Sequence, residues 1–380
     1  MLIGILTQPL KTNYGGLLQA YALQETLRRL GFSCIIINRD YNRPKLNETI
    51  KYSLKKLFFQ IFPTNHWFYK PTSKEYQIIS QNTQAFIDKY LNKSKGNIQS
   101  DSALRKYVNQ IKPNAFIVGS DQVWRPQYSP NIYNYYLDFI QNDPNVKKIS
   151  YAASFGVDDW EYTERETMKC KSLIQLFDSV SVREDTAVNL CQDYFNVKSV
   201  HVLDPTLLLE REYYIQLVND NHPSPSKGNL MTYILDLTEE KRKIIKVVAS
   251  KLSLTPFSVM PEKELDLYTR KNISQCIYPS VYQWIKGFID AEYVVVDSFH
   301  GCVFSIIFNK PFLVIGNESR GMTRFQSLLK MFQLEDRLIY SLDELDENRL
   351  LEKIDWEQVN LLKDKLKQES LNFLVNNLKI

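Results

Sequence analysis

Short apolar runs alternate with segments of helical periodicity along this chain, and that alternation restricts the fold more than any other feature. In the first unit, Leu2–Leu6 has the pattern of a buried strand, Leu17–Leu30 that of an amphipathic helix ended by Gly31, and Cys34–Ile37 that of the next strand. Strands joined by helices pair in parallel. The sequence therefore predicts an α/β protein built on mostly parallel sheets.

The strand pattern stops at Asp204-Pro205 and then restarts, which predicts two Rossmann-like domains. At 380 residues the chain is longer than a single core usually supports. We expect an N-terminal domain at 1–205, a C-terminal domain at 206–355 and a long closing helix at 356–380. The polar segment Pro223–Gly228 is the best candidate linker. The remaining expected strands are Ala115–Val118, Lys148–Ala152, Ser179–Val182, Val200–Leu203, Leu230–Leu235, Pro256–Val259, Tyr293–Val296 and Phe312–Ile315, with helices near 239–252, 281–290 and 301–309.

Charge and cysteine placement exclude several classes of protein. The net charge of the chain is only +4, whereas a nucleic-acid-binding domain usually carries a dense basic surface and a larger positive charge. The five cysteines have no spacing typical of metal ligands or a redox pair, so we expect reduced thiols in the core. No secretory signal and no apolar run of membrane-spanning length is visible. We therefore expect a cytoplasmic protein without a metal or an organic cofactor.

Residues 39–74 carry the strongest local bias, a mixture of basic and aromatic side chains. Ile50, Leu54 and Phe58 follow helical spacing, and Lys51 and Lys55 stand beside them. Such a helix can lie on an anionic membrane, which would place the protein peripherally at the inner membrane face. A helix packed against its own domain with solvated lysines explains the same pattern. Both interpretations stay open.

Open parallel sheets bind ligands beyond the carboxyl ends of their strands, so residues that follow the strands are the candidates for a site. Asn13, Tyr14 and Gly15 lead from the first strand into the first helix, where a glycine lets backbone amides approach a ligand. We expect these three residues to contact an acceptor sugar. Packing of the loop against the helix is the alternative.

A carboxylate and a tryptophan follow the strand Ala115–Val118. If Trp124 is exposed, it can cover an apolar face of a sugar while Asp121 accepts a hydrogen bond or a proton from a hydroxyl. In the alternative, Asp121 caps a turn and Trp124 lies in the core.

Arg183 stands at the end of the strand Ser179–Val182. Its planar guanidinium can give two parallel hydrogen bonds to a carboxylate or phosphate. An ordinary ion pair with Glu184 or Asp185 is the alternative.

The turn Ser298–Gly301 is the clearest candidate, since the strand Tyr293–Val296 there gives way to a helix. Backbone amides at the helix start, the Ser298 hydroxyl and the His300 imidazole converge on one point, which favours an anion. Arg320 and Arg324, after the next strand, would add positive potential, although either can be a solvated surface charge.

Four segments in order resemble the polysaccharide pyruvyl transferase family, over residues 1 to about 330. They are Ile3–Leu6 with Asn13–Gly15, Leu18–Leu23, Gly119–Trp124 and Ser298–Gly301. The resemblance implies a GT-B-like pair of Rossmann-like domains facing across a cleft. It also implies an enzyme that takes phosphoenolpyruvate as co-substrate and forms a pyruvate ketal on a sugar of a cell-surface glycan, often a lipid-linked one.

By the same resemblance, Arg183 and His300 match the arginine and the histidine of the family's donor site. Many members carry an arginine and a leucine before the histidine, where this chain has Ser298 and Phe299. A donor-binding charge is then missing from the turn, and Arg320 or Arg324 is the candidate to supply it. We assign Ser298 and Gly301 to the same donor site.

The residue chemistry fits this reaction, because a small polyanion needs an arginine, a helix N-terminus and an imidazolium in one pocket. We expect His300 to act as the acid or to pair with the phosphate, Arg183 to clamp a carboxylate or phosphate, and Asp121 to orient or deprotonate the sugar hydroxyl.

Two other functions compete with this one. A GT-B glycosyltransferase that uses a nucleotide sugar would usually hold the ribose with an acidic residue in the helix Cys302–Phe308, which contains none. A non-catalytic glycan-binding subunit of an envelope-synthesis complex would not need Arg183 and His300.

Overall fold

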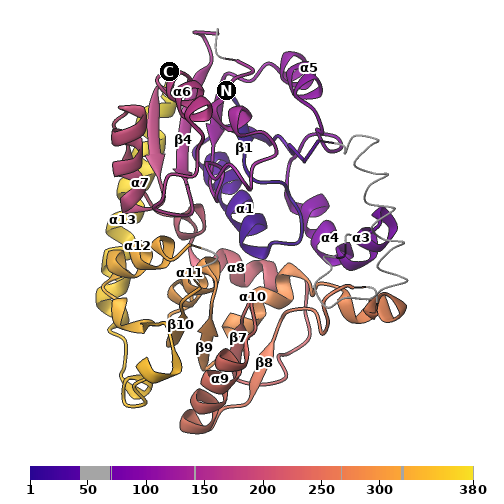
Figure 1. Cartoon of the computed structure of the whole chain (residues 1–380), viewed down its shortest axis with the longest axis vertical. Coiled ribbons are helices and arrows are strands. Elements are labelled where there is room, and N and C mark those ends of the chain that lie inside the picture. Colours follow the sequence, from indigo (N-terminus) through magenta and orange to yellow (C-terminus); the bar gives the residue numbers. More distant parts are fainter. Residues whose placement is uncertain (43–68, 70, 141–142, 267, 318–320, 380) are drawn as a thin grey trace.

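The computed structural model describes the chain except for residues 43–68, 70, 141–142, 267, 318–320 and 380. It contains two parallel-sheet α/β halves, one above the other in Figure 1, as the sequence predicts. The predicted amphipathic segment around Ile50, Leu54 and Phe58 lies outside the described residues, so its interpretation stays a prediction.

The first half is built on a six-stranded sheet in the order β2-β1-β3-β4-β5-β6, and every pair in it is parallel. Its strands are β1 (Leu2–Leu6), β2 (Ser33–Ile36), β3 (Ala115–Val118), β4 (Lys147–Ala153), β5 (Ser179–Val182) and β6 (Val200–His201). Its helices are α1 (Tyr14–Arg29), α3 (Ser73–Ile79), α4 (Gln81–Tyr90), α5 (Asp101–Ile111), α6 (Glu164–Ile174) and α7 (Asp185–Leu190).

The second half is built on a five-stranded parallel sheet in the order β11-β10-β9-β7-β8. Its strands are β7 (Leu230–Tyr233), β8 (Pro256–Ser258), β9 (Tyr293–Val296), β10 (Phe312–Ile315) and β11 (Leu338–Ile339). Its helices are α9 (Glu239–Leu252), α10 (Val281–Asp290), α11 (Phe299–Ile307) and α12 (Thr323–Phe332).

Each sheet has one point at which the strand order reverses. In the first sheet the chain moves from β1 outward to β2 and then back to β3 on the other side, and in the second sheet it does the same from β7 to β8 and back to β9. Ligand crevices form beyond the carboxyl ends of strands at such points. The residues that follow β1, β3, β7 and β9 are therefore placed to form a site.

Two helices begin earlier than the sequence pattern predicts, because a polar side chain caps each of them. The amide of Gly16 donates to Asn13 Oδ1 at 3.1 Å, so α1 begins at Tyr14 and not at Leu17. Ser298 caps α11 in the same way, and that helix therefore includes His300. The elements that were not predicted are helices α3, α4, α5, α6 and α12, the helix Arg211–Asn219 and the edge strand β11.

The segment that joins the two sheets contains a helix, α8 (Arg211–Asn219). Its Tyr214 ring packs edge to face on Phe304 of α11, with centroids 5.0 Å apart. The first sheet ends at His201 and the second begins at Leu230. The domain boundaries at residues 205 and 355 stay our proposal.

The chain closes with α13 (Trp356–Leu378), the expected long C-terminal helix, which runs beside both halves and ends near the first (Figure 1). The amide of Leu203 donates to Ser370 Oγ at 3.0 Å, and the ring of Tyr151 in β4 packs on Phe373 with centroids 6.3 Å apart. The last helix therefore fastens the second half back onto the first.

Apolar packing also joins the halves. One buried cluster includes Leu18 and Leu23 of α1, Trp284 of α10 and Phe304 of α11. All five cysteines are buried free thiols, as predicted. Among the described helices, none has the length and apolar character that a membrane crossing needs.

Candidate active site

A pocket of about 80 Å³ opens where the two reversal points face each other. It is lined from the first half by Asn13, Asp121, Gln122 and Tyr128 and from the second by Tyr233, Leu235, Asp297, Ser298, Phe299, His300 and Arg324. Two larger cavities, of about 180 and 270 Å³, lie in the second half around β11, and no predicted site residue lines them. Five of the predicted site residues therefore meet at the pocket between the reversal points, namely Asn13, Asp121, Ser298, His300 and Arg324.

Three helices begin at this pocket. Asn13 caps α1, Ser298 caps α11, and Arg324 lies in the first turn of α12, and all three residues line the pocket. The N-terminus of a helix carries a partial positive charge and unpaired amide donors. The pocket thus has positive potential from the backbone, in addition to its side chains.

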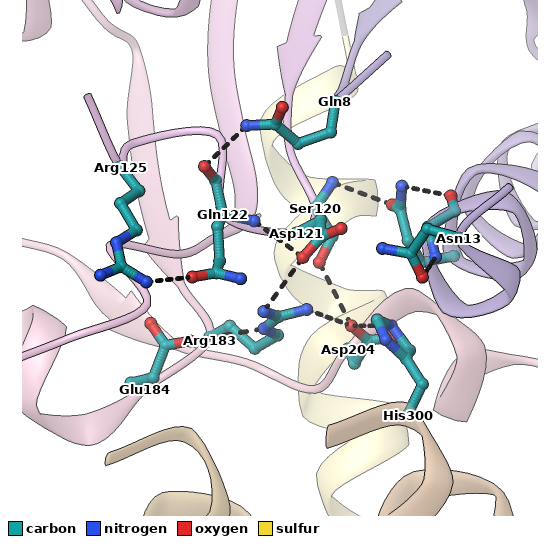
Figure 2. A network of polar contacts seen from close by, with 12 residues as sticks. Gln8, Asn13, Ser120, Asp121, Gln122, Arg125, Arg183, Glu184, Asp204 and His300 are labelled. Atoms are coloured by element: carbon teal, nitrogen blue, oxygen red, sulfur yellow. Dashed lines mark hydrogen bonds and ion pairs between the residues drawn. The ribbon is translucent and has the colours of Figure 1, made fainter. Parts of the chain in front are cut away.

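His300 is nearly buried and lies between the two halves. Its Nε2 is 3.6 Å from Oδ2 of Asp204, and on its other side the ring packs on the backbone of Gly15. A Cβ on Gly15 would overlap the imidazole, so this close approach requires a glycine at position 15. Figure 2 shows His300 directed from α11 toward Asp204 in the first half.

Asp204 is a candidate site residue that the sequence analysis missed. Its Oδ2 lies 2.9 Å from Nη1 of Arg183 and accepts from Ser120 Oγ at 3.3 Å, while its Oδ1 accepts from Thr206 Oγ1 at 2.7 Å. Burial alone would raise the pKa of Asp204, but His300 and Arg183 outweigh it and hold that pKa well below its usual range. The available signal is an acidic residue directly after the expected strand Val200–Leu203.

Arg183 is buried among three carboxylates (Figure 2). Besides its Asp204 bond, Nε lies 3.4 Å from Glu184 and Nη2 lies 3.6 Å from Asp121. Burial alone would lower the pKa of Arg183, but Glu184, Asp204 and Asp121 raise it. The predicted ion pair with Glu184 exists, and Nη2 makes no hydrogen bond to any described residue. Binding of a carboxylate or phosphate by Arg183 stays a prediction.

Arg324 lines the pocket, whereas Arg320 lies outside the described residues. Burial and the nearby charge of Arg183 lower the pKa of Arg324 to about 10, so it remains a cation at neutral pH. The Phe299 ring lies close to both guanidinium groups, with Cζ of Arg183 at 4.2 Å and Cζ of Arg324 at 5.9 Å from its centroid. Phe299 thus lies next to two arginines from other segments of the chain, while the position at which many relatives carry an arginine is occupied by Ser298.

Asp121 lines the pocket from the first half, and a backbone amide fixes the position of its carboxylate. The amide of Gln122 donates to Asp121 Oδ1 at 2.9 Å. Asn13 also lines the pocket and is exposed, so both residues remain candidates for acceptor contact.

Two predicted acceptor residues need correction, because both are buried. Tyr14 donates its hydroxyl to the carbonyl of Pro279 at 2.8 Å and stacks on Trp284, so it fastens α1 to the second half. Trp124 is fully buried, stacks on Tyr136, and donates Nε1 to the carbonyl of Tyr135 at 3.0 Å. The expectation of an exposed aromatic ring at Trp124 is wrong, and neither ring can cover a sugar.

Ser298 and Gly301 shape the turn before His300. Ser298 Oγ accepts from the amide of Gly301 at 3.0 Å, and a Cβ on Gly301 would meet Ser298 Oγ at 2.7 Å. The serine hydroxyl is therefore committed to capping α11, although Ser298 lines the pocket.

A second buried network lies directly beneath this turn and was also missed. Asp297 accepts from Lys241 Nζ at 2.7 Å, from the amide of Leu235 at 2.6 Å and from Asn317 Nδ2 at 3.3 Å. Asp297 follows β9, Leu235 follows β7 and Asn317 follows β10, so these hydrogen bonds join the ends of three strands. They thereby fix the backbone that leads to His300.

No metal centre is visible in the part of the chain that the structure describes. Nowhere there do three or more His, Cys, Asp or Glu side chains gather in an arrangement able to hold a metal ion.

The sequence of the chain matches one protein family over most of its length. The model of the family described as polysaccharide pyruvyl transferase matches residues 13–319, most of the chain. The chain therefore belongs to the polysaccharide pyruvyl transferase family. A search of curated proteins finds no match.

The chain is similar in fold to solved structures of other proteins. The match with a glycosyltransferase of kitacinnamycin has a TM-score of 0.50 at 11% sequence identity. The alignment covers 100% of this chain and 99% of the glycosyltransferase chain. A putative UDP-N-acetylglucosamine 2-epimerase from Listeria monocytogenes has a TM-score of 0.49 at 11% identity, covering 97% of this chain and 90% of its own. At 11% identity the likeness to the kitacinnamycin glycosyltransferase concerns the fold alone, and that fold is GT-B-like.

Proposed function

We propose that this member of the polysaccharide pyruvyl transferase family takes the pyruvyl group from phosphoenolpyruvate and forms a ketal on hydroxyls of a saccharide. The saccharide would belong to a cell-surface polysaccharide or to its lipid-linked precursor. Membership of the family supports modification of a polysaccharide. The choice of donor and the ketal are our proposal.

One arrangement carries the proposal, namely two buried nitrogen donors beside one carboxylate. Arg183 Nη2 and His300 Nε2 make no hydrogen bond to any described residue, although both residues lie next to Asp204. Buried donors of this kind are costly unless a ligand satisfies them. Arg324 and three helix N-termini add positive charge around the same pocket, so the ligand is expected to be a small anion.

The proposed chemistry needs no metal or redox cofactor. A proton is added to the methylene carbon of phosphoenolpyruvate, which develops positive charge at the carbon that bears the phosphate oxygen. A sugar hydroxyl attacks this carbon and gives up its proton, the bond to the phosphate oxygen breaks, and inorganic phosphate leaves. Attack by a second hydroxyl then closes the ketal.

The residues divide between the two substrates. His300 supplies the proton or pairs with the phosphate, and Asp204 holds its imidazole in place. Arg324 and Nη2 of Arg183 bind the anionic groups of the donor. Asp121 orients or deprotonates the attacking hydroxyl, since it lines the pocket from the first half whereas His300 lines it from the second.

Single substitutions test this assignment. His300→Ala and Arg183→Ala should each reduce phosphate release from phosphoenolpyruvate in the presence of acceptor by at least about 100-fold. Near-normal turnover in both variants would show that the assignment is wrong. Release of a nucleoside diphosphate from a nucleotide sugar would instead favour the glycosyltransferase alternative.

Contact with an anionic membrane is a separate part of the proposal. It rests on the basic, aromatic sequence of residues 39–74 and on the lipid-linked acceptors that the family resemblance implies. Sedimentation with liposomes tests it, and equal lack of binding with and without anionic lipid would remove it.

A further inference from the structure

Beside the pocket, three loops of the first half bring an exposed aromatic surface together. The loop after β1 carries Lys11, the segment after β2 carries Tyr41, and the loop after β3 carries Tyr128. Tyr128 lines the pocket, and its carbonyl accepts a hydrogen bond from the Tyr41 hydroxyl at 2.7 Å. The surface of Tyr41 and Tyr128 is therefore continuous with the pocket.

Cations hold both rings in place. Lys11 Nζ lies 4.8 Å from the centroid of the Tyr41 ring, and Cζ of Arg125 lies 4.6 Å from that of Tyr128. Tyr41 nevertheless keeps 44% of its surface exposed, and Tyr128 is half-buried. Preorganised tyrosines of this kind offer a ligand contact area at a low cost in side-chain entropy.

The charges around the two rings are already paired. Lys11 Nζ lies 3.1 Å from Asp40, and Arg125 binds both carboxylate oxygens of Glu161, at 3.0 and 2.9 Å. The two cations that contact these rings, Lys11 and Arg125, therefore offer no unpaired charge to an anionic ligand. A ligand with apolar ring faces and hydroxyl groups, that is, a neutral saccharide, fits the surface better.

We propose that Tyr41 and Tyr128 form an acceptor subsite that holds a further, uncharged sugar residue next to the one that reacts. This inference rests on the proposed transfer to a saccharide and makes the acceptor an oligosaccharide rather than a single sugar. The sugar unit that reacts lies at Asp121, and the neighbouring sugar unit of the same acceptor lies on the rings of Tyr41 and Tyr128.

A binding experiment tests the subsite without requiring turnover. The probes are oligosaccharides of the cell-surface polysaccharide, freed of pyruvate ketals by mild acid and separated into short and long chains. Calorimetry gives the ratio of their dissociation constants for the wild type, Tyr41→Ala, Tyr41→Phe and a control, Tyr340→Ala. Tyr340 is 46% exposed and has a hydrogen-bonded hydroxyl as Tyr41 does, but it does not line the pocket.

The preference for long chains should fall about tenfold in Tyr41→Ala and persist in Tyr41→Phe and Tyr340→Ala. An unchanged preference in Tyr41→Ala, or no preference in the wild type, would overturn the subsite. Phosphate release with phosphoenolpyruvate is measured in parallel. A length preference without pyruvyl transfer would support the subsite and contradict the proposed function, whereas transfer without a length preference would do the reverse.

Discussion

The backbone of Gly15, at the start of α1, packs directly on the imidazole of His300, at the start of α11. The contact joins the two halves of the molecule at the candidate active site. It leaves no space for a side chain at position 15, so the position of the histidine depends on a residue from the other half.

Gly15→Ala should therefore reduce pyruvyl transfer by about 100-fold, because even a small displacement of a reacting group is costly. Alanine in a helix is otherwise more favourable than glycine, so the fold should persist. The control is Gly16→Ala, whose Cβ would meet only the flexible Asn13 side chain, at 3.3 Å. Steady-state kinetics and thermal unfolding of both variants check the prediction, and equal activity of the two would contradict it.

Asp204→Asn should lower both activity and stability. The buried Arg183 loses its nearest carboxylate, which costs about 3 to 5 kcal/mol of unfolding free energy when a buried pair is broken. Urea denaturation at neutral pH measures this loss. A loss below about 1 kcal/mol would mean that Glu184 and Asp121 suffice to compensate Arg183.

The same aspartate makes stability depend on pH in the acid range. Its pKa is lowered in the folded state from a reference value of 3.8, so its contribution is complete above about pH 4 to 5 and is lost as the pH falls toward the folded pKa. The wild type should lose more unfolding free energy than Asp204→Asn between about pH 5 and pH 2. Parallel pH profiles of the two proteins would contradict this assignment.

Arg324→Gln should raise the KM for phosphoenolpyruvate by at least about tenfold, since one charge-assisted contact to the donor is lost. Arg324→Lys should recover part of the affinity by restoring the charge without the planar fork. Lys330→Gln serves as the control, because its side chain is 71% exposed and lies in the same helix. An unchanged KM in Arg324→Gln would assign donor binding to other residues.

Asp297→Ala should destabilise the protein by about 3 to 5 kcal/mol, because Lys241 is left buried without its carboxylate. Replacing both residues, with Lys241→Met and Asp297→Ala, should cost less than the sum of the two single changes. A double-mutant cycle of chemical denaturation measures this coupling. Additive losses would show that the pair does not act as a unit.

The sequence predicted several strands in full because these depend on local patterns. Periodicity located β1, β3, β5 and β9 with their observed bounds, whereas the cap at Ser298, which makes α11 begin before His300, was not predicted. The same patterns contain no information on exposure. Trp124 and Tyr14 were therefore placed at a sugar, although packing between segments far apart in the chain buries both.

The rest of the site depends on contacts between distant residues, which one sequence does not encode locally. Asp204 looked like the end of a domain, and only the fold brings it against Arg183 and His300. Arg324 was a candidate among several charges, and the start of α12 places it in the pocket.

The most direct test of the central claim is product analysis with phosphoenolpyruvate and a polysaccharide freed of its ketals. Mass spectrometry of the glycan and an assay of inorganic phosphate are carried out on the same reaction. We predict one pyruvate ketal formed for each phosphate released, with both absent in His300→Ala. Phosphate release without a ketal, or a hexose added from a nucleotide sugar in its place, would contradict the account.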